Sequence, residues 1–173
     1  MYKMRNNEEK VLKELFNKPT YRFHIRELAR VAKLNPNTII NLTNQLEKEG
    51  IMQKQKKKHL VEISLNFRNP RTIQRRKFFN LLQIQNSGLI EFLVKEYSPK
   101  SITLVGSYSR GEDSEQSDID LVINTLVKEI ADLTKFEKIL GRKIHLLLLA
   151  KKISDEFFNN LINGIVLYGA IKK

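Results

Sequence analysis

The sequence predicts an α+β protein with two modules, a helical N-terminal module that ends in a hairpin and a C-terminal module in which strands and helices alternate. Apolar residues recur at helical spacing in the first fifty positions, whereas short apolar runs of strand length recur after residue 100. Charge is divided in the same way, because residues 1–80 contain 19 Lys and Arg against 7 Asp and Glu, and residues 81–173 contain 12 of each. The whole net charge of +12 therefore lies in the first part, and the two modules are expected to have different partners.

Three helices are expected in the N-terminal module. The first carries an apolar stripe of Val11, Leu12, Leu15 and Phe16. It ends before Pro19, because proline cannot continue a helix. The second, shorter stripe consists of Ile25, Leu28, Ala29 and Ala32. Asn35 is a good N-cap, Pro36 suits the first helical position and Gly50 suits the residue after the end, so a third helix is expected over 36–48.

The third helix has two chemically different faces. One face is apolar and consists of Ile39, Leu42 and Leu46. The opposite face is polar and consists of Asn37, Asn41, Asn44 and Lys48. Beyond this helix, Met52–Lys54 and Leu60–Ser64 are predicted to form two strands joined by a QKKKH turn.

Three helices followed by a basic hairpin resemble the winged helix-turn-helix fold of many prokaryotic transcription regulators. The resemblance covers residues 6–66 and rests on HIRELARVAKLNPNTIINLTNQLEKEGI and on the lysine-rich hairpin. It implies that helix 36–48 lies in the major groove of double-stranded DNA, reading bases through Asn37, Thr38, Asn41 and Asn44. The DNA phosphates would then be contacted by four lysines of the hairpin, namely Lys54, Lys56, Lys57 and Lys58. The alternatives are a winged helix used for protein contacts or dimerisation, and a lysine-rich surface that serves solubility.

The C-terminal module is expected to begin after a helical connector over 67–87. The connector starts at Asn69-Pro70, and its basic first turns are better explained as a solvated face than as a DNA contact. Strands are then predicted over 102–105, 118–124 and 143–149, and helices over 130–140 and 155–163. A sharp turn is expected at Gly106-Ser107, and a short IVLYG segment follows the last helix.

Asp118 and Asp120 stand one residue apart on an apolar run. On a strand the side-chain period is two, so both carboxylates point to one face while Ile119 and Leu121 point to the other. Two neighbouring carboxylates repel each other unless a cation lies between them, which points to a metal ion. The alternatives are a cap at the end of a strand and a Ca²⁺ loop.

The stretch GSYSRGEDSEQSDIDLVI resembles the signature of the minimal nucleotidyltransferases of the DNA polymerase β superfamily, which is Gly-Ser, about ten residues and Asp-x-Asp. Arg110-Gly111 and the terminal NGIVLYG also match, and the resemblance covers residues 88–173. It implies that Asp118 and Asp120 bind Mg²⁺, an ion that prefers oxygen ligands. It also implies that an NTP, namely ATP, binds at Gly106, Ser107 and Arg110. Arg110 would steady the pyrophosphate charge, or it is only a solvent-exposed arginine.

One position departs from that pattern. Active members of this superfamily generally carry a third carboxylate on the next long strand, and the matching segment GRKIHLLLL has His145 there. A neutral imidazole can act as a base but brings no negative charge for a second Mg²⁺. The alternatives are an alignment shifted by a few residues, a His145 that only packs, and a ligand from the loop, where nothing favours one of Glu112, Asp113 and Glu115.

Two functions from different classes follow. The first is an Mg²⁺-dependent nucleotidyltransferase acting on a hydroxyl, with a protein acceptor such as a HEPN-type toxin implied by the resemblance. The second is a DNA-binding regulator whose nucleotidyltransferase-like domain senses nucleotide or is inactive. A homodimer is compatible with both. The chain has no cysteine and no apolar run long enough for a membrane, so a cytoplasmic protein is expected.

Overall fold

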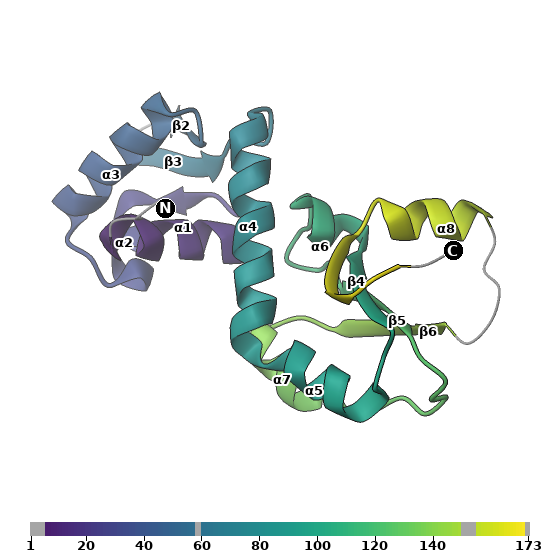
Figure 1. Cartoon of the computed structure of the whole chain (residues 1–173). Coiled ribbons are helices and arrows are strands. Elements are labelled where there is room, and N and C mark those ends of the chain that lie inside the picture. Colours follow the sequence, from purple (N-terminus) through teal and green to yellow (C-terminus); the bar gives the residue numbers. More distant parts are fainter. Residues whose placement is uncertain (1–5, 58–59, 150–154, 172–173) are drawn as a thin grey trace. The chain divides into compact units, whose positions relative to one another are not determined.

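The computed structural model describes residues 6–57, 60–149 and 155–171 and is drawn in Figure 1. The chain divides into two compact units, Met1–Arg76 and Lys77–Lys173. The boundary lies inside helix α4 (Pro70–Ser87), so this helix contributes its first turns to the N-terminal unit and its remainder to the C-terminal unit. The domain bounds expected from the sequence stay predictions.

The N-terminal unit contains three helices and a small antiparallel sheet. Its helices are α1 (Asn6–Asn17), α2 (Ile25–Ala32) and α3 (Pro36–Lys48). Its strands are β1 (Phe23–His24), β2 (Met52–Lys57) and β3 (Leu60–Leu65), in the order β1-β3-β2. The three expected helices are present, whereas the two-residue strand β1, which pairs with β3, was not anticipated.

Helix α3 begins and packs as its sequence predicts. Asn35 lies in the N-cap position, where its Oδ1 accepts a hydrogen bond from the backbone N–H of Asn37 at 2.8 Å, and Pro36 follows it. Ile39 and Leu46 are completely buried in the core of the unit. The exposed side of α3 is polar apart from Ile40.

The hairpin of β2 and β3 is longer than the sequence suggested. Strand β2 continues to Lys57, and the paired residues run from Met52 opposite Leu65 to Lys57 opposite Leu60. Gln55, Lys56 and Lys57 were expected in the turn but lie in the strand. Glu62 of β3 accounts for part of this extension, because it binds the side chains of both Lys57 and Arg22 at 3.2 Å.

The C-terminal unit is built on a four-stranded mixed sheet. Its strands are β4 (Ser101–Val105), β5 (Ile119–Asn124), β6 (Ile144–Leu149) and β7 (Ile165–Gly169), in the order β6-β5-β4-β7. Strand β4 is antiparallel to β5 and β7, whereas β5 and β6 are parallel. The helices besides the end of α4 are α5 (Leu89–Tyr97), α6 (Gly106–Arg110), α7 (Thr134–Leu140) and α8 (Asp155–Ile162).

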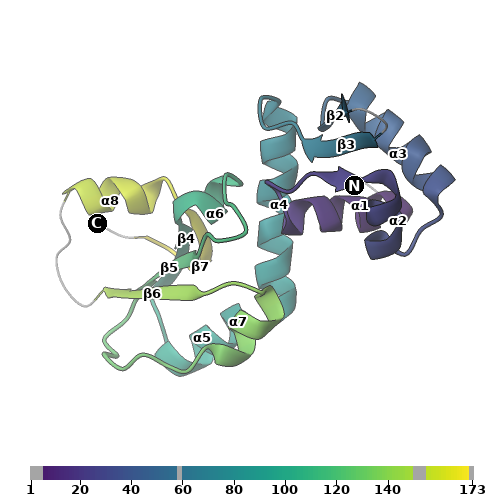
Figure 2. The same ribbon diagram turned by 180° about the vertical axis from the view of Figure 1, so that it is seen from behind.

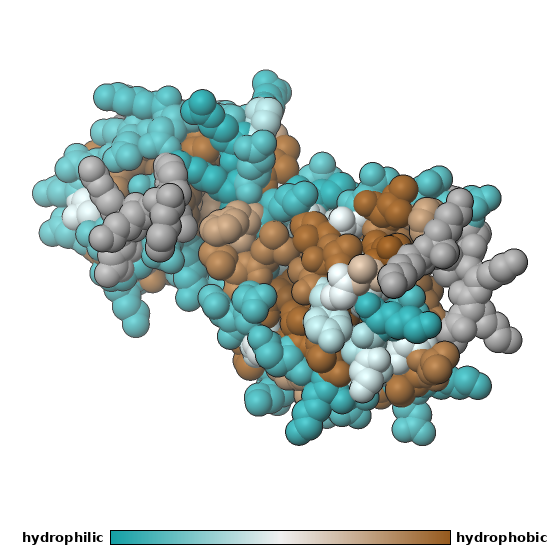
Figure 3. Space-filling model, viewed as in Figure 1, coloured by the Kyte–Doolittle hydropathy of each residue, from teal (hydrophilic) through white to brown (hydrophobic). Residues whose placement is uncertain are grey.

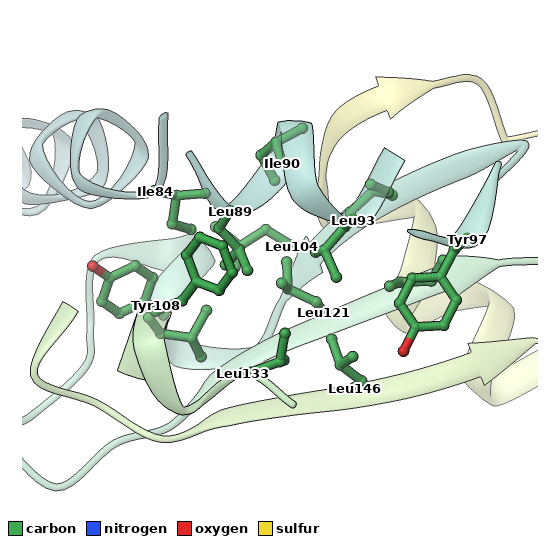
Figure 4. Close-up of a cluster of buried hydrophobic side chains, with 14 residues drawn as sticks. Ile84, Leu89, Ile90, Leu93, Tyr97, Leu104, Tyr108, Leu121, Leu133 and Leu146 are labelled. Carbon is green, nitrogen blue, oxygen red and sulfur yellow. The ribbon is translucent and has the colours of Figure 1, made fainter. Parts of the chain in front are cut away.

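The main core of this unit lies between one face of the sheet and the helices α4, α5 and α7. Figures 1 and 2 show α5 and α7 on one side of the sheet and α8 on the other. The close-up in Figure 4 shows the buried side chains, among them Leu93 of α5, Leu104 of β4 and Leu121 of β5. Successive residues of a strand point to opposite faces of the sheet, so the neighbours of Leu104 in β4 and of Leu121 in β5 point to the other face.

Three local predictions for the C-terminal unit were wrong in detail. The expected sharp turn at Gly106-Ser107 is the first turn of helix α6. Strand β5 begins at Ile119, so Asp118 lies just before the strand. Helix α7 begins at Thr134 instead of residue 130, because Oδ1 of Asp132 accepts hydrogen bonds from the backbone N–H and the hydroxyl of Thr134 and stops the helix from extending backwards.

The two units also differ in their surfaces. On the face drawn in Figure 3, hydrophilic residues cover most of the N-terminal unit, whereas broader hydrophobic areas lie on the C-terminal unit. Among the described helices, none has both the length and the apolar character that a membrane crossing requires.

Candidate active site

The residues predicted to bind metal and nucleotide lie at one end of three neighbouring strands. Asp120 is near the start of β5, and it pairs with Val105 at the end of β4 on one side and with His145 of β6 on the other. Gly106 follows Val105 directly. Ile119 and Leu121 on either side of Asp120 are completely buried in the main core, so Asp120 points to the opposite face of the sheet. The structure therefore brings Gly106, Asp120 and His145 together.

Gly106 lies so close to the Asp120 carboxylate that a side chain at position 106 would displace the carboxylate. A Cβ atom built on Gly106 would collide with Oδ2 of Asp120. The backbone of Gly106 also has φ +73°, a value that favours glycine. The conformation thus favours glycine here, and any larger residue would move the Asp120 carboxylate. Because glycine has no side chain, the Asp120 carboxylate can lie directly beside the backbone at the start of α6.

Asp118 is exposed and lies beside a cation. The backbone N–H of Ile119, the next residue, donates to the carbonyl of Lys143 at 2.9 Å. The pKa of the Lys143 ammonium is raised, first by its hydrogen bond to Glu137 at 2.8 Å and then by the charges of Glu137 and Asp118. Lys143 thus interacts electrostatically with Asp118, and its positive charge partly compensates the negative charge of the carboxylates at this site.

His145 occupies the position next to Asp120 where a further carboxylate was expected. Its Nδ1 atom lies 3.7 Å from Oδ1 of Asp120, and its side chain is 75% exposed. His145 therefore does not pack into the core. Within residues 6–57, 60–149 and 155–171, no three His, Asp or Glu side chains form a group that could hold a metal ion.

The acidic residues of the preceding loop have other partners. Glu112 binds Arg110 at 2.8 Å on the surface. Asp113 is buried and binds Arg142 at 2.9 Å. Asp118 and Asp120 remain as candidate ligands. Mg²⁺ typically binds through one or two carboxylates together with phosphate and water oxygens. The carboxylate oxygens of Asp118 and Asp120 are therefore of a kind that suits Mg²⁺.

The predicted nucleotide-binding residues Ser107 and Arg110 belong to the short helix α6. The Ser107 carbonyl accepts the backbone N–H of Glu112 at 3.1 Å, which closes the turn after α6. The side chain of Ser107 is half-buried, and that of Arg110 is exposed and engaged with Glu112. Arg110 would have to exchange this partner to reach a phosphate.

The sequence did not single out the buried residues that hold the loop between α6 and β5. Arg142 contacts several parts of this loop, and Asn80 of α4 donates through Nδ2 to Oδ1 of Asp113 at 2.8 Å and to the carbonyl of Tyr108 at 2.9 Å. Charged and amide side chains are usually exposed, so composition gives no sign that these three are buried. The one sequence signal that points to Arg142 is its position in the GRK segment, directly before the predicted third strand.

The residues predicted to read DNA lie on α3 in the N-terminal unit. Asn37, Asn41 and Asn44 are exposed, and Thr38 is half-buried. The three amide side chains therefore face solvent along one side of the helix, where they can form hydrogen bonds with a ligand. The Oδ1 atom of Asn44 accepts a hydrogen bond from Nζ of Lys54, so this amide already has one partner.

The predicted phosphate-binding lysines differ in their surroundings. Lys54 is only 16% exposed and also forms an ion pair with Glu47 at 3.5 Å, so it links β2 to α3. Lys57 pairs with Glu62. Lys56 is exposed and has no ion pair to another described residue. Lys58 lies outside the described residues.

Comparison with known proteins bears on the C-terminal unit. Residues 87–168 match the family of nucleotidyltransferase domains, and this segment contains Gly106, Asp120 and His145. A protein of Methanocaldococcus jannaschii named as a candidate protein adenylyltransferase is 35% identical to the chain over 85 residues. The match covers 45% of this chain and 84% of that relative. The predicted resemblance of the C-terminal module is thereby confirmed at the level of the family.

Proposed function

The chain belongs to the nucleotidyltransferase domain family, and from that premise we propose that it transfers a nucleoside monophosphate from ATP to a hydroxyl group of a protein. The observation that carries the proposal is the proximity of Gly106, Asp120 and His145: Asp120 of β5 pairs with His145 of β6 and with Val105 of β4, the residue directly before Gly106. The name of the Methanocaldococcus jannaschii relative, a candidate protein adenylyltransferase, favours a protein as acceptor. A HEPN-type toxin is one protein of that kind.

Each residue of the site has a role in this reaction. Asp118 and Asp120 would hold Mg²⁺, which neutralises triphosphate charge and polarises the α-phosphate when bound. Gly106 lets the phosphates approach the backbone, and Ser107 donates hydrogen bonds from its hydroxyl and amide. The acceptor oxygen forms a bond to the α-phosphorus while the bond to the bridging oxygen breaks and pyrophosphate leaves. His145 accepts the hydroxyl proton, and Arg110 steadies the pyrophosphate charge.

The test uses the whole chain with ATP labelled at the α-phosphate, Mg²⁺ and a lysate of a host cell as the source of acceptors. Label in a protein band that disappears after protease treatment but not after nuclease treatment supports the proposal. Label that is removed by nuclease would show a nucleic-acid acceptor instead. A parallel reaction with ATP labelled at the γ-phosphate is the control, because nucleotidyl transfer releases that label in pyrophosphate.

A second function is favoured by one feature of the site. His145 stands beside Asp120 without adding a negative charge, and the described residues offer no third acidic ligand. Such a site suits binding of one Mg²⁺–nucleotide complex without rapid turnover. The corresponding protein would be a DNA-binding regulator that senses nucleotide. Calorimetry that finds Mg²⁺-dependent ATP binding, together with no incorporated label, would favour this function.

We also propose that the N-terminal unit is a winged helix-turn-helix that binds double-stranded DNA. Helix α3 exposes Asn37 and Asn41, and Lys56 lies exposed on the β2–β3 hairpin. These are the groups that base reading and phosphate binding use, respectively. The test is binding of the whole chain to a mixed pool of duplexes at several salt concentrations. An affinity that falls steeply with salt is expected, because bound phosphates release counterions.

A further inference from the structure

Arg142 occupies an unusual place for an arginine. Its side chain is only 8% exposed, and its Nη2 lies 2.9 Å from Oδ2 of Asp113, whose side chain is completely buried. Its guanidinium also lies over the Tyr108 ring, with 5.3 Å from Cζ to the ring centroid. Arg142 is thus held on one side by a carboxylate and on another by an aromatic ring.

The remaining donors of Arg142 are directed at the loop that leads to Asp118. Nη1 donates to the carbonyl of Ser117 at 3.0 Å and also to the carbonyl of Ser114. The Ser117 carbonyl belongs to the same planar peptide unit as the N–H of Asp118. A hydrogen bond to this carbonyl therefore restrains the backbone immediately before the predicted metal-binding carboxylate.

The other end of the loop is fixed through Asp113. Asn80 donates to Oδ1 of Asp113 at 2.8 Å, while Arg142 holds Oδ2. The same Asn80 amide donates to the carbonyl of Tyr108, in the helix that follows Gly106. The buried contacts thus connect α6, the loop and the start of β5 in one network around Arg142.

Stability alone does not account for this arrangement. A buried ion pair contributes about as much to stability as an apolar pair of similar volume, or less, because both charges lose their hydration. An apolar pair, however, donates no hydrogen bonds to the Ser114 and Ser117 carbonyls. What the arginine adds is a pair of hydrogen bonds to the loop backbone directly before Asp118.

We propose that Arg142 is a positioning residue that sets the metal-binding geometry of Asp118, with Asp113 orienting its guanidinium. The proposal rests on the proposed nucleotidyl transfer, since it assigns Asp118 to the metal. Arg142 itself does not touch the substrate. It acts on the ligand through the peptide unit between Ser117 and Asp118.

The test compares two variants with the native chain. Arg142→Lys keeps the positive charge beside Asp113 but replaces the planar fork with a single ammonium group. Asp113→Leu combined with Arg142→Met removes both charges together, so that no buried charge is left unpaired. Arg68→Lys, which changes an exposed arginine of the N-terminal unit, is the control for the chemical change itself.

The first measurement is amide hydrogen exchange in peptides covering 111–119, made without metal or nucleotide. We expect exchange about tenfold faster in this segment for the double variant, because two loop carbonyls lose their donor. Exchange in β4 and the melting temperature should remain close to native. Native exchange in 111–119 of a folded double variant would overturn the proposal, and Arg142→Lys provides the same comparison if the double variant does not fold.

The second measurement is the Mg²⁺ concentration that gives half-maximal transfer. An increase of roughly tenfold or more is expected in both variants, because misplacement of a ligand weakens metal binding. A purely structural arginine would lower the melting temperature and leave this Mg²⁺ dependence unchanged. If the native chain neither transfers nor binds nucleotide, the proposed function fails, while the exchange experiment still decides whether Arg142 holds the loop.

Discussion

The N-terminal and C-terminal units use charged side chains in different ways. In the N-terminal unit two exposed cations, Arg22 at 52% and Lys57 at 59%, contact the same Glu62. In the C-terminal unit Arg142 and Asp113 form a pair that is withdrawn from solvent and bonded to backbone carbonyls. Exposed pairs contribute little individually, whereas a buried group that loses its partner is expensive.

This difference predicts how sensitive each unit is to single changes. The proposed DNA binding through exposed lysines of the N-terminal unit would be a sum of similar contacts, so that removal of one contact should weaken it by a modest factor. The site of the C-terminal unit depends on a few groups in fixed positions, where a small displacement has a large effect. The changes below are ordered from the largest expected effect to the smallest.

The largest effect is expected for Asp118→Asn combined with Asp120→Asn. Both carboxylate charges are lost while the side-chain volumes stay nearly the same, so Mg²⁺-dependent ATP binding should disappear and the fold should persist. Calorimetry of ATP with and without Mg²⁺ measures this, and circular dichroism monitors the fold. Unchanged nucleotide affinity in the double variant would show that the metal site lies elsewhere.

His145→Ala should slow transfer by roughly 10²-fold or more, the usual contribution of a general base. His145→Asp should raise transfer above the native rate at a given Mg²⁺ concentration, because it adds a carboxylate next to Asp120. Leu147→Ala, which changes a partly exposed residue two positions along the same strand face, is the matched control. A fast native protein that tolerates His145→Ala would place His145 outside the site.

Gly106→Ala should lower the transfer rate by roughly tenfold to a hundredfold. The added methyl group collides with Asp120 and also disfavours the positive φ of the glycine. Gly88→Ala is the matched control, since Gly88 has φ +74° and an added Cβ would meet nothing within 4 Å. Equal losses in the two variants would mean that backbone strain, and not the contact with Asp120, is responsible.

In the N-terminal unit the expected losses of DNA affinity are smaller, and they are distributed over several lysines. Replacing Lys56, Lys57 and Lys58 together with alanine should weaken binding to all duplexes alike and reduce the salt dependence by about one unit of slope per lost phosphate contact. The control removes three lysines from the C-terminal unit, namely Lys95, Lys128 and Lys135. An equal effect of the control set would attribute binding to net charge alone.

Replacing Asn37 and Asn41 with alanine should instead reduce the discrimination between DNA sequences. Each bidentate contact to a base is worth about 1–3 kcal/mol of discrimination against the wrong base. Competition between a preferred and a scrambled duplex measures the change. If affinity falls equally for both duplexes, the two amides contribute to binding without reading sequence.

The smallest effect is expected for Glu137→Gln. The hydrogen bond from Lys143 at 2.8 Å, and then that from the backbone N–H of Ile144, lower the pKa of Glu137 below its ordinary value of 4.5. The stability that this group adds is therefore present above about pH 4.5 and is lost as the pH falls through the lowered pKa. Native and variant melting temperatures should differ slightly at neutral pH and converge in acid. A difference that persists in acid would point to lost packing instead.

The sequence predicts the elements that have strong local signals. Helix α3 has an N-cap, a proline and an apolar stripe, and its observed bounds agree with the expected range of 36–48. Strand β2 was predicted too short because its last three residues are polar, and their pairing depends on β3 and not on their own propensity. Strand β1 was not predictable because two residues are too few to show a periodic pattern, and it forms through its pairing with β3.

The candidate site was predictable only in part for a related reason. Gly106, Asp118 and Asp120 belong to one continuous motif, and His145 could be placed because the strand after the motif is strongly apolar. Asp113 and Arg142 are far apart in the sequence, and each resembles an ordinary surface charge. Their pairing appears only when the loop and the start of β6 are placed together.

The first turns of α4 have a consequence for any attempt to cut the chain into fragments. Asn69 donates through Nδ2 to the carbonyl of Gly50 at 2.9 Å, and the hydroxyl of Thr72 donates to the carbonyl of Ile51 at 3.1 Å. A fragment truncated after Asn66 would lose both donors, and the Gly50 and Ile51 carbonyls would keep only the hydrogen bonds that Asn66 donates to them. It would also lose Arg75, which joins Glu8 of α1 to Glu49. An expression fragment of the N-terminal unit should therefore extend past Arg75.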